Sequence, residues 1–137
     1  FTHQGAPWCH MERVVNIPFP YEAERMPALP ENPTEDEKRR FESYPQQGTI
    51  EEVESFFDQY VEFSRERNAP VYCGEFGCFI PFAKHEERVN WYTIVRTLLE
   101  ERGIARTSWD YYGGFGIFKM KSDKFTAEGR RRVSPRR

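Results

Sequence analysis

The chain has 137 residues and a formal net charge of −2, with 38% hydrophobic and 31% charged residues. This length suits one domain, and the composition argues against a disordered, collagen-like or membrane-spanning chain. Three cysteines cannot all pair, so a disulfide-rich scaffold is excluded. Aromatic residues reach 16%, which is enough for a core with a surplus for a binding surface. No segment is typical of a signal peptide, and a start at Phe1 rather than Met leads us to expect a fragment.

The segment 11–48 is rich in proline, at positions 18, 20, 27, 30, 33 and 45. Prolines at this density disfavour a continuous helix or a central strand, so we expect a long loop. A short helix over 34–44 is compatible with the pattern, because Thr34 can cap it. The next helix is clearer: Thr49 followed by Glu52 matches a capping box, and apolar residues at helical spacing continue until Asn68.

The segment 70–76 predicts a short buried strand, along which Val71, Cys73 and Glu75 share one face by two-residue alternation. A helix is expected over 86–102, ended by Gly103, and a further strand over 104–109. Helices that alternate with strands indicate a parallel α/β sheet. The glycine-rich segment 113–116 is interpreted as a tight turn.

In parallel α/β proteins, ligands and catalytic groups gather beyond the carboxyl ends of the strands. The sequence offers three such ends, at 1–8, 74–77 and 108–111, which together display a His, a Glu and two Trp. Aromatic faces stack on sugar rings, and a carboxylate can attack an anomeric carbon. A carboxylate at a strand end among aromatic rings therefore points to sugar chemistry.

Three segments also carry a resemblance: Phe1-Thr-His-Gln-Gly-Ala-Pro-Trp8, Pro70-Val-Tyr-Cys-Gly-Glu-Phe-Gly77 and Trp109-Asp-Tyr-Tyr-Gly-Gly-Phe-Gly-Ile-Phe118. Their order and spacing resemble the last third to half of a cellulase-type enzyme of glycoside hydrolase family 5. The resemblance implies an incomplete (β/α)8 TIM barrel, to which residues 1–118 contribute about strands six to eight. It further implies retaining cleavage of β-1,4-glucan or a related polysaccharide, without metal or other cofactor, by an extracellular or periplasmic protein.

By this resemblance Glu75 matches the catalytic nucleophile at the end of strand seven, and Trp109 matches the aromatic floor of the subsite for the cleaved sugar. His3 and Trp8 fall on a stretch that resembles a substrate-contacting loop. The acid/base Glu of the family follows an Asn on strand four, and this sequence has no Asn-Glu dipeptide. We therefore expect the isolated 137 residues to be inactive.

Other interpretations stay open at this point. Glu75 could pair with Arg88 or Arg106, and Trp8 and Trp109 could be core aromatics. The chain could also be a non-catalytic α/β module that binds carbohydrate or a protein partner. A zinc site would draw on the residues Cys9, His10, Cys73, Cys78 and His85, but their spacing does not fit the usual closely paired ligands.

Residues 119–137 hold eight Lys or Arg against two acidic residues, and we expect a disordered basic tail. Such a tail can bind nucleic acid, but it lacks the interleaved aromatics that stack on bases. We expect no nucleic-acid or membrane partner. A part-barrel leaves strand edges unpaired, so the isolated chain is expected to self-associate.

Overall fold

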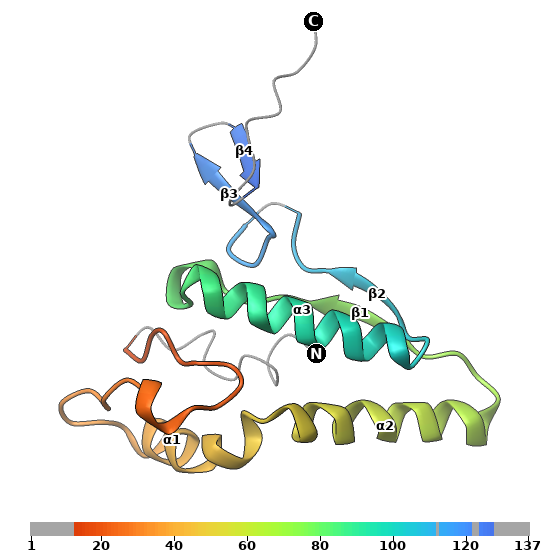
Figure 1. The fold of residues 1–137 in the computed structure, drawn as a ribbon, viewed down its shortest axis with the longest axis horizontal. Helices are drawn as coiled ribbons and strands as arrows, with labels where there is room; N and C mark the ends of the chain where they lie inside the picture. Colours follow the sequence, from red (N-terminus) through yellow and green to blue (C-terminus); the bar gives the residue numbers. More distant parts are fainter. Residues whose placement is uncertain (1–12, 112, 122–123, 128–137) are drawn as a thin grey trace, which may run out of the picture.

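The computed structural model describes residues 13–111, 113–121 and 124–127. In these ranges, helices pack on a parallel strand pair, and a hairpin follows (Figure 1). The elements in chain order are η1 (Ala23–Arg25), α1 (Glu35–Gln47), α2 (Ile50–Arg67), β1 (Tyr72–Phe76), η2 (Ile80–Phe82), α3 (His85–Glu101), β2 (Ala105–Ser108), β3 (Phe118–Lys121) and β4 (Lys124–Ala127). Among these described helices, none is long and apolar enough to cross a membrane.

The predicted helix ends are present where the sequence placed their caps. The Thr34 hydroxyl accepts from the Glu37 N–H at the start of α1, and the Thr49 hydroxyl accepts from the Glu52 N–H at the start of α2. Asn68 ends α2 in the left-handed conformation, with φ of 48°. Gly103 follows α3 with φ of 65°, which a residue without Cβ adopts at little cost.

The first helix is longer than predicted. It continues past Tyr44 to Gln47 and contains Pro45, so this proline does not end it. Pro45 lies in the last turn, where the missing N–H costs one hydrogen bond, and the chain closes the helix afterwards with a bond from the Gly48 N–H to the Tyr44 carbonyl (2.7 Å).

Glu37 is buried at the start of α1 and is held by three hydrogen bonds, two accepted by its carboxylate and one donated by its backbone N–H. Its Oε2 accepts from the Thr34 backbone N–H (2.6 Å) and from Arg13 Nη1 (3.1 Å), while its own N–H donates to the Thr34 hydroxyl. The hydrogen bond from the Thr34 N–H, with the nearby Arg13 charge, holds the pKa of Glu37 below its ordinary value. The carboxylate therefore stabilises the fold in its charged form.

The Glu37→Gln variant is expected to be less stable than the wild type at about pH 6 and to approach it as the pH falls to about pH 3. Because the pKa of Glu37 is lower in the folded state than in the unfolded state, its carboxylate stabilises the fold at pH values above the unfolded-state pKa. This stabilisation is lost as the pH falls through the folded-state pKa. Thermal unfolding followed by circular dichroism across this range measures the difference. Glu42→Gln, on the exposed part of the same helix, corrects for the loss of one negative charge. A gap between Glu37→Gln and wild type that is the same at every pH would contradict the prediction.

The strands β1 and β2 are parallel, as predicted, and α3 connects them. Tyr72 pairs with Ala105 and Phe76 pairs with Ser108, but the register shifts between Cys73 and Phe76. This bulge breaks the two-residue alternation, because an extra residue on one strand reverses which face the next side chain takes. Phe76 is buried and Glu75 is exposed.

The expected shared face of Val71, Cys73 and Glu75 is therefore wrong. Val71 and Cys73 pack against the core, whereas Glu75 is exposed. The expectation of a buried strand is also wrong, since Tyr72 is 60% exposed and Phe76 is the one buried residue of β1.

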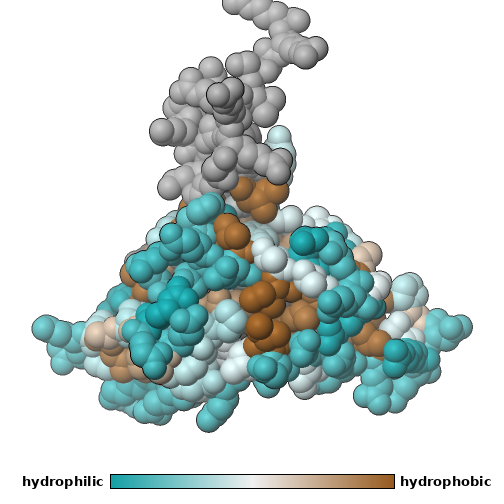
Figure 2. Space-filling view, viewed as in Figure 1, coloured by the Kyte–Doolittle hydropathy of each residue, from teal (hydrophilic) through white to brown (hydrophobic). Residues whose placement is uncertain are grey.

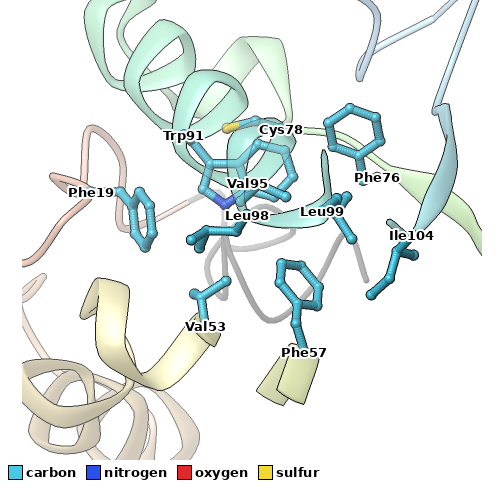
Figure 3. Packing of buried hydrophobic residues seen from close by; sticks show 10 residues of the cluster. All are labelled: Phe19, Val53, Phe57, Phe76, Cys78, Trp91, Val95, Leu98, Leu99 and Ile104. Atoms are coloured by element: carbon cyan, nitrogen blue, oxygen red, sulfur yellow. The ribbon is translucent and has the colours of Figure 1, made fainter. Parts of the chain in front are cut away.

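The main core lies where α2, α3 and the strand pair meet (Figure 3). Trp91, Val95 and Leu98 come from the predicted apolar stripe of α3, and Val53 and Phe57 come from that of α2. The remaining members of the cluster are Phe19, Phe76, Cys78, Leu99 and Ile104. A smaller cluster around Val14 and Tyr44 fills the space beside α1.

The proline-rich segment is tied to α3 and to the loop after β1. The buried carboxylate of Glu87 accepts from the Phe19 N–H (3.0 Å) and forms an ion pair with Arg25. The Asn16 N–H donates to the Phe82 carbonyl (2.7 Å). Hence the part of this segment that precedes α1 is held in place by contacts with distant residues more than by regular secondary structure.

The first part of the expected basic tail, residues 119–137, overlaps the last two described strands. β3 and β4 pair as an antiparallel hairpin, with Phe118 opposite Ala127. Alternating apolar and polar residues over this stretch suit a short strand pair. The rest of the predicted tail, residues 128–137, lies outside the described residues.

Candidate active site

The two principal candidate residues lie at the same edge of the strand pair. Glu75 directly precedes Phe76, and Trp109 directly follows Ser108, the residue that pairs with Phe76. The Trp109 N–H donates to the Phe76 carbonyl (2.8 Å), so the two backbones are joined at this point. The backbone positions that carry the Glu75 carboxylate and the Trp109 indole therefore meet at the carboxyl end of the strand pair.

Phe76 and Ser108, the strand residues next to Glu75 and Trp109, point toward the core. The Phe76 ring stacks on Trp91 at 6.0 Å between centroids, and the Ser108 hydroxyl oxygen is buried. Glu75 directly precedes the buried Phe76, and neighbouring side chains on a strand point to opposite faces, so Glu75 lies on the face opposite the Phe76–Trp91 stack. Glu75 is exposed and Trp109 is 47% exposed, which makes both accessible to a ligand.

The two arginines considered as ion-pair partners of Glu75 each donate a hydrogen bond to another group. Arg106 Nη2 donates to Glu100 Oε1 (2.6 Å), and Arg88 Nη2 donates to the carbonyl of Gly116 (2.6 Å). Trp109 is 47% exposed, so it is not a core aromatic.

The loops that follow β1 and β2 pack closely against each other through glycine. A Cβ on Gly77 would lie 2.0 Å from the Trp109 carbonyl oxygen, a distance that no side chain tolerates. A Cβ on Gly114 would lie 2.2 Å from the Phe79 ring. The backbone at Trp109 can approach the end of β1 because position 77 carries no side chain.

The turn after Trp109 is the tight turn that the sequence predicted. Gly113 adopts φ of 151°, and a Cβ there would lie 2.0 Å from the Asp110 carboxylate. The same carboxylate accepts from the Phe115 N–H (3.2 Å) across the turn. The Trp109–Asp110 peptide bond is cis, and Tyr111 beyond it is 77% exposed.

Two predicted site residues, His3 and Trp8, lie outside the described residues, as do Cys9 and His10. Cys73 is half-buried, and burial raises the pKa of its thiol, while Cys78 is fully buried. Within the described ranges, no three His, Cys, Asp or Glu side chains gather in a way that could hold a metal ion.

Sequence reasoning missed Tyr92, which contacts both loops of the site. Its hydroxyl donates to the Phe115 carbonyl (2.5 Å) and accepts from the Cys78 N–H (3.3 Å). The residue stands beside Trp91 in an amphipathic helix, where a tyrosine is an ordinary occupant. No signal in the sequence distinguishes it from a packing residue.

The fold and the candidate site together indicate a class of protein, the parallel α/β proteins that carry their sites at strand ends. A β–α–β unit with a carboxylate and an aromatic side chain at its strand ends is the arrangement from which parallel α/β proteins, barrels included, build ligand and catalytic sites. An exposed carboxylate can act there as a nucleophile or as an electrostatic partner of a developing positive charge.

Comparisons with known proteins show which members of this class the chain is similar to. No protein-family profile matches the chain. It is 26% identical over 125 residues to Endoglucanase 3 of Fibrobacter succinogenes, which covers 87% of this chain and 19% of that protein. A hyperthermophilic endo-β-1,4-glucanase solved with substrate is similar over 92% of this chain and 33% of its own, with 25% identity and a TM-score of 0.57. Endoglucanase Cel5A of Thermotoga maritima is 27% identical over 86% of this chain and 30% of its own, with a TM-score of 0.51.

These matches confirm the predicted resemblance to cellulase-type glycoside hydrolases of family 5: the chain is similar in sequence and in structure to endoglucanases. The structural neighbours are TIM-barrel enzymes, and the β1–α3–β2 unit is compatible with part of such a barrel. The chain spans about a fifth of the length of the curated relative and about a third of the solved structures.

Proposed function

We propose that the chain supplies about strands six to eight of the catalytic barrel of a retaining endo-β-1,4-glucanase, with Glu75 as its nucleophile. The observation that carries this proposal is the exposed Glu75 carboxylate at the carboxyl end of β1, next to Trp109 at the end of the neighbouring strand. In a (β/α)8 barrel, these strand ends open into the active site. β1 and β2 would be strands seven and eight.

Exposed apolar surface supports the view that further strands and helices pack here. The aromatic residues Tyr60, Phe63 and Tyr72 are large and exposed. Figure 2 shows, in addition, apolar residues at the surface near the centre of one face. A groove of about 230 Å³ runs between α2 and β1, lined by Phe56 and Tyr72 among others. A monomer rarely leaves such a surface uncovered, and in a barrel the preceding strand and helix would fill it.

The chemistry would proceed in two balanced steps. The Glu75 carboxylate forms a bond to the anomeric carbon while the glycosidic bond breaks and the leaving oxygen takes a proton from the acid group. Water then attacks the same carbon, gives its proton back to that group and releases Glu75. Trp109 would stack on the sugar ring, and His3 and Trp8 would help to line the cleft. No metal or organic cofactor takes part.

The acid group would come from the part of a longer protein that this chain does not include. Retaining hydrolysis needs two carboxyl groups about 5–5.5 Å apart, and no Asn-Glu dipeptide is available here. The isolated 137 residues would therefore release no sugar, and their open strand edges would favour self-association. The longer protein would work outside the cytoplasm, where its polysaccharide substrate is found.

A covalent trap tests the nucleophile directly. The longer protein is incubated with a 2-deoxy-2-fluoro-cellobioside that carries a good leaving group, because the fluorine slows release of the glycosyl-enzyme. Peptide mass spectrometry is expected to find the sugar on Glu75, and the Glu75→Gln variant and the isolated 137 residues are expected to remain unlabelled. A label on another carboxylate, or labelling of Glu75→Gln, would contradict the assignment.

A further inference from the structure

Two loops carry the site, and their mutual contacts decide its geometry. The first, residues 77–82, continues from Glu75, and the second, residues 109–117, begins with Trp109. Besides the Trp109 N–H bond, the Ile80 N–H donates to the Gly114 carbonyl (2.6 Å). The Phe79 and Phe115 rings are 4.9 Å apart between centroids. The relative position of the carboxylate and the indole thus depends on how these loops are held together.

Tyr92 joins the two loops from the helix beneath them. Its hydroxyl lies between a donor of the first loop, the Cys78 N–H, and an acceptor of the second, the Phe115 carbonyl. A hydroxyl can accept one hydrogen bond while it donates another, which neither Phe nor an aliphatic residue can do. The Tyr92 ring is fixed in turn by edge contacts with Phe76 (5.6 Å) and Trp91 (5.2 Å).

The protonated form of Tyr92 is the one that makes this bridge. Burial raises the pKa of its hydroxyl above the ordinary value, so the proton needed for the bond to Phe115 stays in place. On the same side, the buried Arg88 donates to the Gly116 carbonyl and holds the end of the second loop to α3. Two side chains of α3 therefore donate hydrogen bonds to consecutive carbonyls of the second loop, those of Phe115 and Gly116.

We propose that Tyr92 is a positioning residue for the substrate platform: its hydroxyl links the loop after Glu75 to the turn after Trp109 and so sets the indole relative to the carboxylate. This inference rests on the proposed function. It predicts that loss of the Tyr92 hydroxyl weakens the binding of sugar by Trp109, although this hydroxyl itself does not contact the sugar. The fold is retained because the ring still fills its place.

The test compares Tyr92→Phe with a matched control, Tyr44→Phe, in the longer protein. Tyr44 is a buried tyrosine whose hydroxyl, like that of Tyr92, donates to a backbone carbonyl, here that of Pro18 (2.7 Å), but it lies in the other apolar cluster. Both variants lose one hydroxyl that is hydrogen-bonded to a backbone carbonyl, so they share any general effect on stability. Tyr92→Phe also leaves the Cys78 N–H and the Phe115 carbonyl without that partner.

The readouts are kinetics on a soluble glucan and ¹⁹F NMR of the protein labelled with 5-fluorotryptophan. The Trp109 resonance is assigned as the one that Trp109→Phe removes. Tyr92→Phe is expected to shift or broaden this resonance, leave that of Trp91 in place, and lower kcat/KM about tenfold, mainly through KM. Tyr44→Phe is expected to change neither the resonance nor KM.

Each other outcome overturns the inference. A Trp109 resonance in Tyr92→Phe that superposes on the wild type would show that the hydroxyl does not position the indole. Broadening of every tryptophan resonance would assign Tyr92 a general structural role instead. The NMR measurement needs no substrate, so a failure of the proposed hydrolysis is distinguished from a failure of the positioning role.

Discussion

The Glu75→Gln variant of the longer protein is expected to hydrolyse soluble β-1,4-glucan at least about a thousandfold more slowly than the wild type, which corresponds to about 4 kcal/mol of transition-state stabilisation. A neutral amide cannot form the glycosyl-enzyme and cannot stabilise positive charge at the anomeric carbon. Because Glu75 is exposed, the substitution should leave folding unchanged. Initial rates, with circular dichroism as a check on folding, measure the effect.

Two further variants sharpen this result. Glu75→Asp keeps the charge but withdraws the carboxylate by one methylene, and a displacement on that scale is expected to cost about a hundredfold in rate. Glu66→Gln, at an exposed position near the end of α2, controls for the loss of a surface charge and should be as active as the wild type. Turnover by Glu75→Gln at the wild-type rate would remove Glu75 from the mechanism.

The Trp91→Ala variant is expected to lose about 3–5 kcal/mol of stability. Trp91 is 1% exposed, and its ring contacts both Phe76 and Tyr92 in the main core. Removal of the indole leaves a cavity that the surrounding helix and strand can fill only in part. Urea unfolding followed by far-UV circular dichroism measures the loss, and this signal does not depend on tryptophan.

Trp109→Ala provides the comparison within the same chain. This indole is 47% exposed, so its removal should cost far less stability than that of Trp91, while it should weaken glucan binding. Equal losses of stability for the two variants would mean that Trp109 is a packing residue and would count against its role as a sugar platform.

Much of the local structure follows from the sequence. Thr34 and Thr49 offer side-chain acceptors to helix N-termini, and Asn68 and Gly103 tolerate the left-handed conformation that ends a helix. These effects act between residues a few positions apart, so the helices can be assigned without knowledge of the fold. The alternation of helices and strands likewise predicted the parallel pair of β1 and β2.

The sequence also located the candidate site. The strand ends at Glu75 and Trp109 lie together because parallel strands bring their carboxyl ends to one edge. The three resembling segments indicated the cellulase-type relatives, and the comparisons confirmed them. The roles of Glu75, Trp109, His3 and Trp8 stay proposals that the variants above test.

The orientation of the site depends on contacts between distant residues, which local patterns do not encode. Strict alternation put Glu75 on the same face as Val71 and Cys73, which pack against the core, but the register shift between Cys73 and Phe76 leaves Glu75 exposed and Phe76 buried. The bulge arises from the pairing of two strands separated by a helix. Tyr92 illustrates the same limit, because its two hydrogen-bond partners are 14 and 23 residues away. Local spacing thus specified the helices, the strands and the end of the strand pair that carries the candidate site. Long-range strand pairing and packing set the directions of the side chains at that site.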